Sequence, residues 1–186
     1  MKPKLFQDVD GAINVLPKSE GNLDKRPHLR VWGEWKTLVI DGYTITYSPE
    51  LITHLNRISQ KAEIVWLTTW HEEAARDFAP AVGLNDFPFV SPVGRDDAWY
   101  SGAASFNWLP ENRWWKLNAI LEHMDSEEAP FIWVDDFLRS HTKQLLKRRM
   151  KESGQSGLML IPFQNVGMTP EHIKQIDEFI DSHSTP

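Results

Sequence analysis

Near the start of the chain lies Lys4-Leu5-Phe6-Gln7-Asp8-Val9-Asp10-Gly11, a short apolar segment that ends in two aspartates and a glycine. Residues i and i+2 of an extended segment point the same way, so a strand here would present both carboxylates to one site. Like charges disfavour each other, and a hard cation such as Mg2+ bound by oxygen ligands would relieve the repulsion. Gly11 lets the backbone turn sharply away. Taken alone, the stretch also fits a solvated Asp-x-Asp-Gly turn, so the remainder of the chain has to decide.

The composition is that of a soluble globular protein. The 186 residues are 41% hydrophobic and 25% charged, and this length predicts a single domain over residues 1–186. Cys is absent, which excludes disulfides, thiolate nucleophiles and cysteine metal sites. Without a signal-peptide pattern or an apolar run of membrane-spanning length, we expect a cytoplasmic protein with no membrane partner. The net charge of −6 argues against wide duplex binding, but not against binding one nucleotide or one strand end.

Short apolar runs alternate with helical patterns, which predicts an α/β fold with a mostly parallel sheet. Strands are expected at residues 5–6, 64–67, 131–134 and 158–161. The run 87–90 contains a proline, so it is an edge strand at best. Helices are expected from Pro49, over 117–124 and from Pro170, because each segment carries an apolar stripe at helical spacing.

Residues 30–47 interrupt this alternation and predict a β-hairpin. Strand-like stretches at 31–35 and 37–40 precede Asp41-Gly42, a dipeptide typical of tight hairpin turns, and another follows at 43–47. The hairpin falls between the first strand and the first helix, so it should project over the carboxyl end of the sheet. Ligands bind at that end in open α/β folds. Trp32 and Trp35 would then face the mouth of the site.

Three further features stand where a site built on Asp8 and Asp10 would need them. Thr68-Thr69 follow the second strand, Asp135-Asp136 follow the third, and Lys116 begins the helix over 117–124. Each has a simpler interpretation, because Thr and Asp pairs after strands commonly cap helices, and a lysine beside an apolar stripe commonly extends to water. Their joint occurrence in this order is much less ordinary and favours a functional site.

On these residues the sequence resembles the haloacid dehalogenase-like (HAD) superfamily of phosphohydrolases. The matching positions are Asp8-Val9-Asp10-Gly11, Thr68, Lys116 and Asp135-Asp136. A narrower similarity, to the HAD domain of the Swiss Army Knife RNA repair proteins, also takes in 65–70, 133–136 and 167–172. The resemblance implies a Rossmann-like three-layer sandwich with a small β-hairpin flap as its minimal cap. Gln7 stands where the family usually has an apolar residue, and Ala12 replaces a common threonine.

The resemblance implies a Mg2+-dependent phosphatase that works through an aspartyl-phosphate. Asp8 would attack phosphorus, and Asp10 would act as general acid and then as general base. Mg2+ would be held by Asp8, by the backbone carbonyl of Asp10 and by the pair Asp135 and Asp136, with Asp135 favoured as the direct ligand. Thr68, Thr69 and Lys116 would hold the phosphoryl oxygens.

Substrate choice is expected to depend on an aromatic segment over residues 99–115. Trp99, Trp108 and Trp114 offer rings for stacking on a base, and Arg113 offers a cation for a phosphate. The alternative is that this segment buries its own aromatics against the fold. A small cap leaves an open site, which suits a large substrate such as an RNA or DNA end or a protein, with a nucleotide as a further alternative. Other readings are a protein or small-metabolite phosphatase, and a non-catalytic phosphate-binding module, which the complete set of polar residues disfavours.

Overall fold

The centre of the molecule is a four-stranded parallel sheet. The computed structural model describes residues 2–16, 27–91 and 114–183. The strand order is β4-β1-β5-β6, with β1 (Lys4–Gln7), β4 (Glu63–Trp66), β5 (Phe131–Val134) and β6 (Gly157–Leu160). The register pairs Lys4 with both Glu63 and Phe131, and Phe131 with Gly157, so the four strands end at one edge. Asp8 follows the interior strand β1 directly and therefore lies at the middle of that edge.

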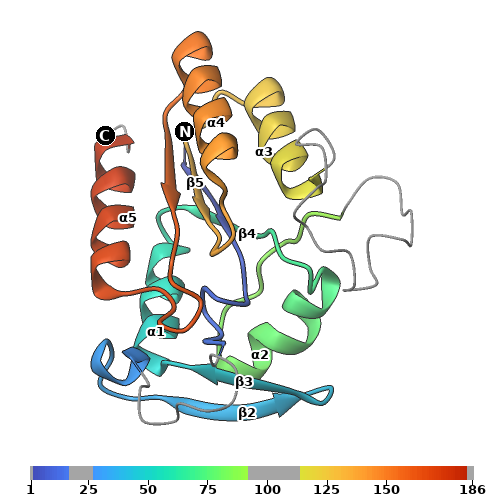
Figure 1. Ribbon diagram of the computed structural model, residues 1–186, viewed down its shortest axis with the longest axis vertical. Coiled ribbons are helices and arrows are strands. Elements are labelled where there is room, and N and C mark those ends of the chain that lie inside the picture. The colour runs from blue at the N-terminus through green and yellow to red at the C-terminus, as the bar shows by residue number, and fades with distance from the viewer. Residues whose placement is uncertain (1, 17–26, 92–113, 184–186) are drawn as a thin grey trace.

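Helices cover both faces of this sheet and make three layers (Figure 1). They are α1 (Pro49–Ile58), α2 (Ala79–Val82), α3 (Trp115–Ser126), α4 (Ser140–Ser153) and α5 (Pro170–His183), with a 3-10 helix η1 (Pro27–Arg30) and a π-helix η2 (Ala74–Phe78). Leu5 belongs to the core under α1 and α5, and its neighbour Phe6 to the core under α3 and α4. The predicted α/β sandwich is confirmed. Among the described residues, no helix is both long and apolar enough to cross a bilayer.

The strands agree with the sequence to within one residue at each end. They read as unbroken apolar runs because both faces of a parallel sheet are buried. The segment 87–90 adds only a single bridge, between Phe89 and Trp66, with two backbone hydrogen bonds beside β4. This segment lies at the edge of the sheet, as the proline at position 88 indicated. The helical turns over 74–82 were not predicted, since they are short and contain Pro80.

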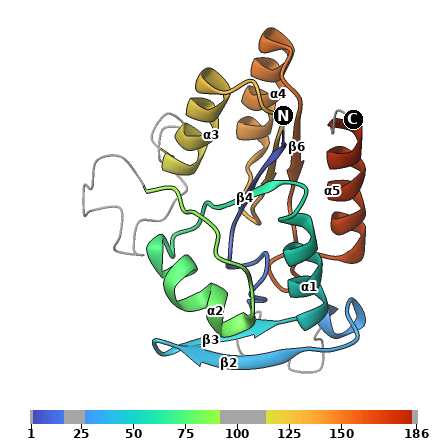
Figure 2. The same cartoon turned by 180° about the vertical axis from the view of Figure 1, so that it is seen from behind.

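The hairpin, called the flap below, consists of β2 (Lys36–Ile40) and β3 (Tyr43–Tyr47). Both turn residues have positive φ, 46° at Asp41 and 84° at Gly42, as the tight hairpin turn requires. The flap lies across the end of the molecule where the parallel strands finish, next to α2 (Figures 1 and 2). The predicted flap is confirmed for residues 36–47.

Residues 31–35 do not extend the flap as predicted. Trp32 is 6% exposed, and its indole N–H donates a 2.8 Å hydrogen bond to the carbonyl of Met168. Its ring lies 5.7 Å from that of His54 on α1. Burial of this large side chain against the core bends the chain before β2 begins. Trp32 therefore stabilises the core, and the expectation that it faces the mouth of the site is wrong.

Candidate active site

The loop after β1 holds Asp8 in place through its backbone. The N–H of Asp8 donates to the carbonyl of Val134 at 3.1 Å, which continues the pairing with β5. The fully buried Gln7 amide donates to the Asp8 carbonyl at 2.8 Å. The N–H of Val9 donates to Asp8 Oδ1 at 2.8 Å. Gln7, a departure from the family pattern, thus contributes a hydrogen bond beneath the proposed nucleophile.

Gly11 allows two parts of the site to meet. Its φ is +72°, a region that L side chains rarely adopt. A Cβ at this position would also overlap the carboxyl group of Asp136. The absence of a side chain therefore lets the loop turn and lets Asp136 pack against it.

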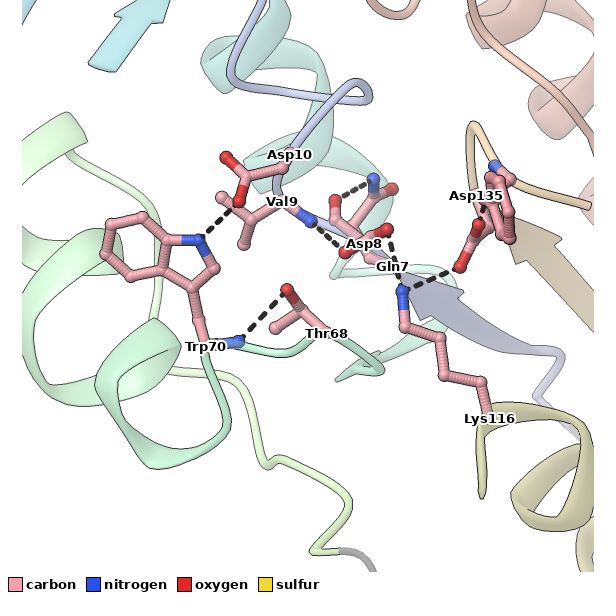
Figure 3. Close-up of polar contacts among 9 residues, drawn as sticks. Gln7, Asp8, Val9, Asp10, Thr68, Trp70, Lys116 and Asp135 are labelled. Carbon is pink, nitrogen blue, oxygen red and sulfur yellow. Dashed lines mark hydrogen bonds and ion pairs between the residues drawn. The ribbon is translucent and has the colours of Figure 1, made fainter. Parts of the chain in front are cut away.

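Lys116 points into the protein rather than toward water. It lies in the first turn of α3, is 5% exposed, and places Nζ 2.7 Å from Asp8 Oδ2 and 2.7 Å from Asp135 Oδ2 (Figure 3). Asp135 is fully buried, and its Oδ1 accepts a 2.8 Å hydrogen bond from the N–H of Phe137. One buried ammonium thus bridges carboxylates that follow two neighbouring strands.

Burial dominates the electrostatics of this group. It raises the pKa of Asp8 to about 7, against the opposing effect of the Lys116 ammonium, and Asp135 raises it further. Burial alone would lower the pKa of Lys116, but the Asp135 and Asp8 carboxylates raise it above its usual value. Burial and then Asp135 raise the pKa of Asp136 to about 6. The site therefore holds more negative charge than its lysine compensates, which favours a bound cation.

Asp8, Asp135 and Asp136 can hold a metal ion together. Each offers one carboxylate oxygen, and these oxygens lie within 4.8 Å of one another. Three hard oxygen donors suit Mg2+. The Asp10 carboxylate is outside this group, so its part in metal binding stays limited to the predicted backbone carbonyl. Which of Asp135 and Asp136 binds directly stays a prediction.

The two threonines after β4 differ in position. Thr68 is 1% exposed, and a hydrogen bond from its hydroxyl works to lower the pKa of Asp8. Thr68 Oγ1 also lies 3.4 Å from the N–H of Trp70. Thr69 is exposed beside it. The structure therefore brings Thr68 to Asp8 and leaves Thr69 at the rim.

Asp10 is held at both carboxylate oxygens. Asn14 Nδ2 donates to Oδ1 at 2.7 Å, and Trp70 Nε1 donates to Oδ2 at 2.9 Å (Figure 3 draws the second contact). Asn14 Oδ1 in turn accepts the N–H of Thr46 on β3 at 2.9 Å, so the flap is tied to Asp10. No sequence pattern indicates Asn14, and Trp70 enters the site prediction only as part of the matching segment 65–70. Asn14 follows Asp10 by four residues, and this short separation is the local signal for their contact.

Of the four residues proposed for substrate binding, Trp114 lies within the described residues, whereas Trp99, Trp108 and Arg113 lie outside them. Trp114 is half-buried, with its ring 5.2 Å from Trp133 and 6.5 Å from Phe137. These contacts give Trp114 a packing role just before α3 begins. A substrate contact for it stays a prediction.

Fold and site together define the class of protein. A three-layer α/β sandwich with an Asp-x-Asp loop under a small flap is the architecture of HAD-like hydrolases of phosphate esters. More particularly, the chain belongs to the family described as the HAD domain in Swiss Army Knife RNA repair proteins, whose model matches residues 4–173. No curated protein and no solved structure gave a match. HAD proteins generally use Mg2+, and the buried acidic group is a place for it.

Proposed function

We propose that the protein is a Mg2+-dependent phosphatase that acts through an aspartyl-phosphate on a nucleotide or a nucleic acid end. The observation that carries this proposal is the buried ammonium of Lys116, 2.7 Å from both Asp8 and Asp135. A buried cation between two carboxylates is expensive to keep for stability alone, because desolvation offsets much of the attraction. It has a clear use where a phosphoryl group has to be bound next to a carboxylate nucleophile.

The chemistry divides between Asp8 and Asp10. An Asp8 carboxylate oxygen forms a bond to phosphorus while the bond to the leaving oxygen breaks, and protonated Asp10 gives its proton to that oxygen. Asp10 then takes a proton from water as the water oxygen attacks phosphorus, and phosphate leaves Asp8. Asn14 and Trp70 fix the direction of the Asp10 carboxyl group through both of its oxygens. Each oxygen keeps a further lone pair for the transferred proton.

Groups next to Asp8 would offset the negative charge of the phosphoryl group. Lys116 and Thr68 would hold phosphoryl oxygens, and their contacts with Asp8 support this role. Mg2+, held by Asp8, by Asp135 or Asp136 and by the Asp10 carbonyl, would neutralise further negative charge. An acidic site needs such cations to admit a phosphate dianion. The family description, which names RNA repair, and the small flap support a nucleotide or nucleic acid end as substrate.

Phosphate release from p-nitrophenyl phosphate, and from oligonucleotides phosphorylated at the 3′ or 5′ end, tests the proposal. Wild type with Mg2+ should release phosphate, whereas Asp8→Asn should be inactive while still folding. Asp86→Asn, which alters an exposed carboxylate, is the matched control and should stay active. Borohydride reduction during turnover should label residue 8, because it reduces acyl phosphates. Turnover by Asp8→Asn would refute the assignment of Asp8 as the nucleophile. If wild type released no phosphate from any of these esters, the proposed phosphatase function would be refuted.

A further inference from the structure

The inner face of the flap ends in an aromatic ring that the core does not cover. Tyr43 begins β3 and pairs with Ile40. Side chains alternate along a strand, so Tyr43 shares a flap face with Ile45 and Tyr47. Those two are 0% and 7% exposed, whereas Tyr43 is 67% exposed. The flap therefore carries Tyr43 beyond the core on its core-facing side.

Trp70 connects this ring to the catalytic residues. The ring centroids of Tyr43 and Trp70 are 5.9 Å apart and their planes meet at 59°. Trp70 also packs on Phe78, 5.7 Å away, and its indole N–H holds Asp10 Oδ2. In Figure 3, Trp70 lies beside Asp10, on the side away from Lys116. The site thus has a charged end at Lys116 and an aromatic end at Trp70 and Tyr43.

The direction of the proposed reaction assigns the two ends to different parts of the substrate. The phosphoryl group lies at Lys116 and Thr68, and Asp10 protonates the leaving oxygen. The group attached to that oxygen therefore begins beside Asp10. A group that extends away from the charged end would pass Trp70 and reach Tyr43.

We propose that Tyr43 and Trp70 form a subsite for the base of the nucleotide that carries the phosphate. This inference rests on the phosphatase function proposed above and adds the part of the substrate that is recognised. Stacking on aromatic rings suits a base of any sequence, because every base has a π face. The bond from Thr46 to Asn14 fixes the flap to the Asp10 loop, which keeps Tyr43 at a set distance from the reacting atoms.

Oligonucleotides with a terminal phosphate, each paired with one whose terminal nucleotide is abasic, isolate the base contact. Both 3′ and 5′ phosphates are compared. Tyr43→Ala should lower kcat/KM on base-bearing ends by about 5- to 150-fold, as expected for one stacked base, and leave abasic ends unchanged. Tyr43→Phe keeps the ring and should behave as wild type. Val39→Ala, on the outer flap face and 66% exposed in the wild type, is the matched control.

The outcomes separate this inference from the phosphatase function. Equal losses on base-bearing and abasic ends would assign Tyr43 a structural role and overturn the subsite, as would no loss on either. Wild type that dephosphorylates both kinds of end equally well would also overturn it, with the phosphatase intact. As a readout apart from turnover, the Asp8→Asn protein should bind base-bearing ends more tightly than abasic ones, and adding Tyr43→Ala should remove the difference.

Discussion

Replacing Lys116 with methionine tests the buried charge arrangement most directly. Methionine keeps a similar length but removes the ammonium that lies 2.7 Å from Asp8 and from Asp135. Removing one partner of a buried ion pair typically costs about 3–5 kcal/mol, because the remaining charge stays buried without compensation. Both carboxylates of this site are buried, so this range applies.

Protonation of Asp8 relieves part of this cost. Burial already raises its pKa to about 7, and loss of the ammonium raises that pKa further. We therefore take the lower end of the range, about 3 kcal/mol, and choose pH 8.5, where protonation relieves less. For a chain of this size, that loss lowers the melting temperature by roughly 6–12 °C.

The assay is urea unfolding in chelator at pH 8.5, followed by circular dichroism. Lys147→Met makes the same substitution at an exposed position of α4 and should leave the unfolding free energy within about 0.5 kcal/mol of wild type. Added Mg2+ should stabilise Lys116→Met more than wild type, because its carboxylates have lost their internal cation. If Lys116→Met unfolds within about 1 kcal/mol of wild type in chelator, the reasoning about a buried, bridging ammonium is refuted.

Three further outcomes are expected. Gly11→Ala should lower the unfolding free energy by at least about 1–2 kcal/mol, because the new side chain would have to adopt a positive φ and its Cβ would overlap the Asp136 carboxyl group. An unchanged urea midpoint would contradict this. Asp135→Asn should need more Mg2+ for half-maximal phosphate release, and an equal requirement would remove Asp135 from the metal site. His172 Nδ1 accepts the Thr169 N–H at the start of α5, and burial lowers its pKa. Because the folded pKa is the lower one, this stabilisation is present above about pH 6.5 and is lost as pH falls through the folded value. The unfolding free energy of wild type should thus fall relative to that of His172→Gln between pH 7 and 5. If urea unfolding shows the same difference at both pH values, His172 does not contribute to the pH dependence.

The part of the site that follows strands could be predicted from the sequence. Asp8, Thr68 and Asp135 each follow an apolar run that forms a strand. The carboxyl ends of neighbouring parallel strands lie at the same end of the sheet, regardless of how the connecting helices pack. Lys116 was predicted from its place before a helical stripe, although only the structure shows that it points inward.

The contacts of Asp10 depend on docking and have no local pattern. Trp70 reaches Asp10 only because the turn after β4 packs on Phe78, and Asn14 meets Thr46 only because the flap lies over the Asp10 loop. The bend over residues 31–35 also depends on tertiary packing. The residues there have strand-like sequences, but burial of Trp32 against the core sets their conformation. Tertiary burial outweighed β propensity in that segment.

The sheet order also sets when the site can form during synthesis. Strand β1 needs β4 and β5 on its two sides, and Lys4 pairs with Phe131. At ribosomal rates of about 5–20 residues per second, β1 waits on the order of ten seconds for β5 to be made. During that interval the apolar residues of β1 lack their neighbours on β5. The nascent chain therefore carries an unpaired strand edge that invites association with other chains, and the candidate site is complete only after Asp135 and Asp136 have emerged.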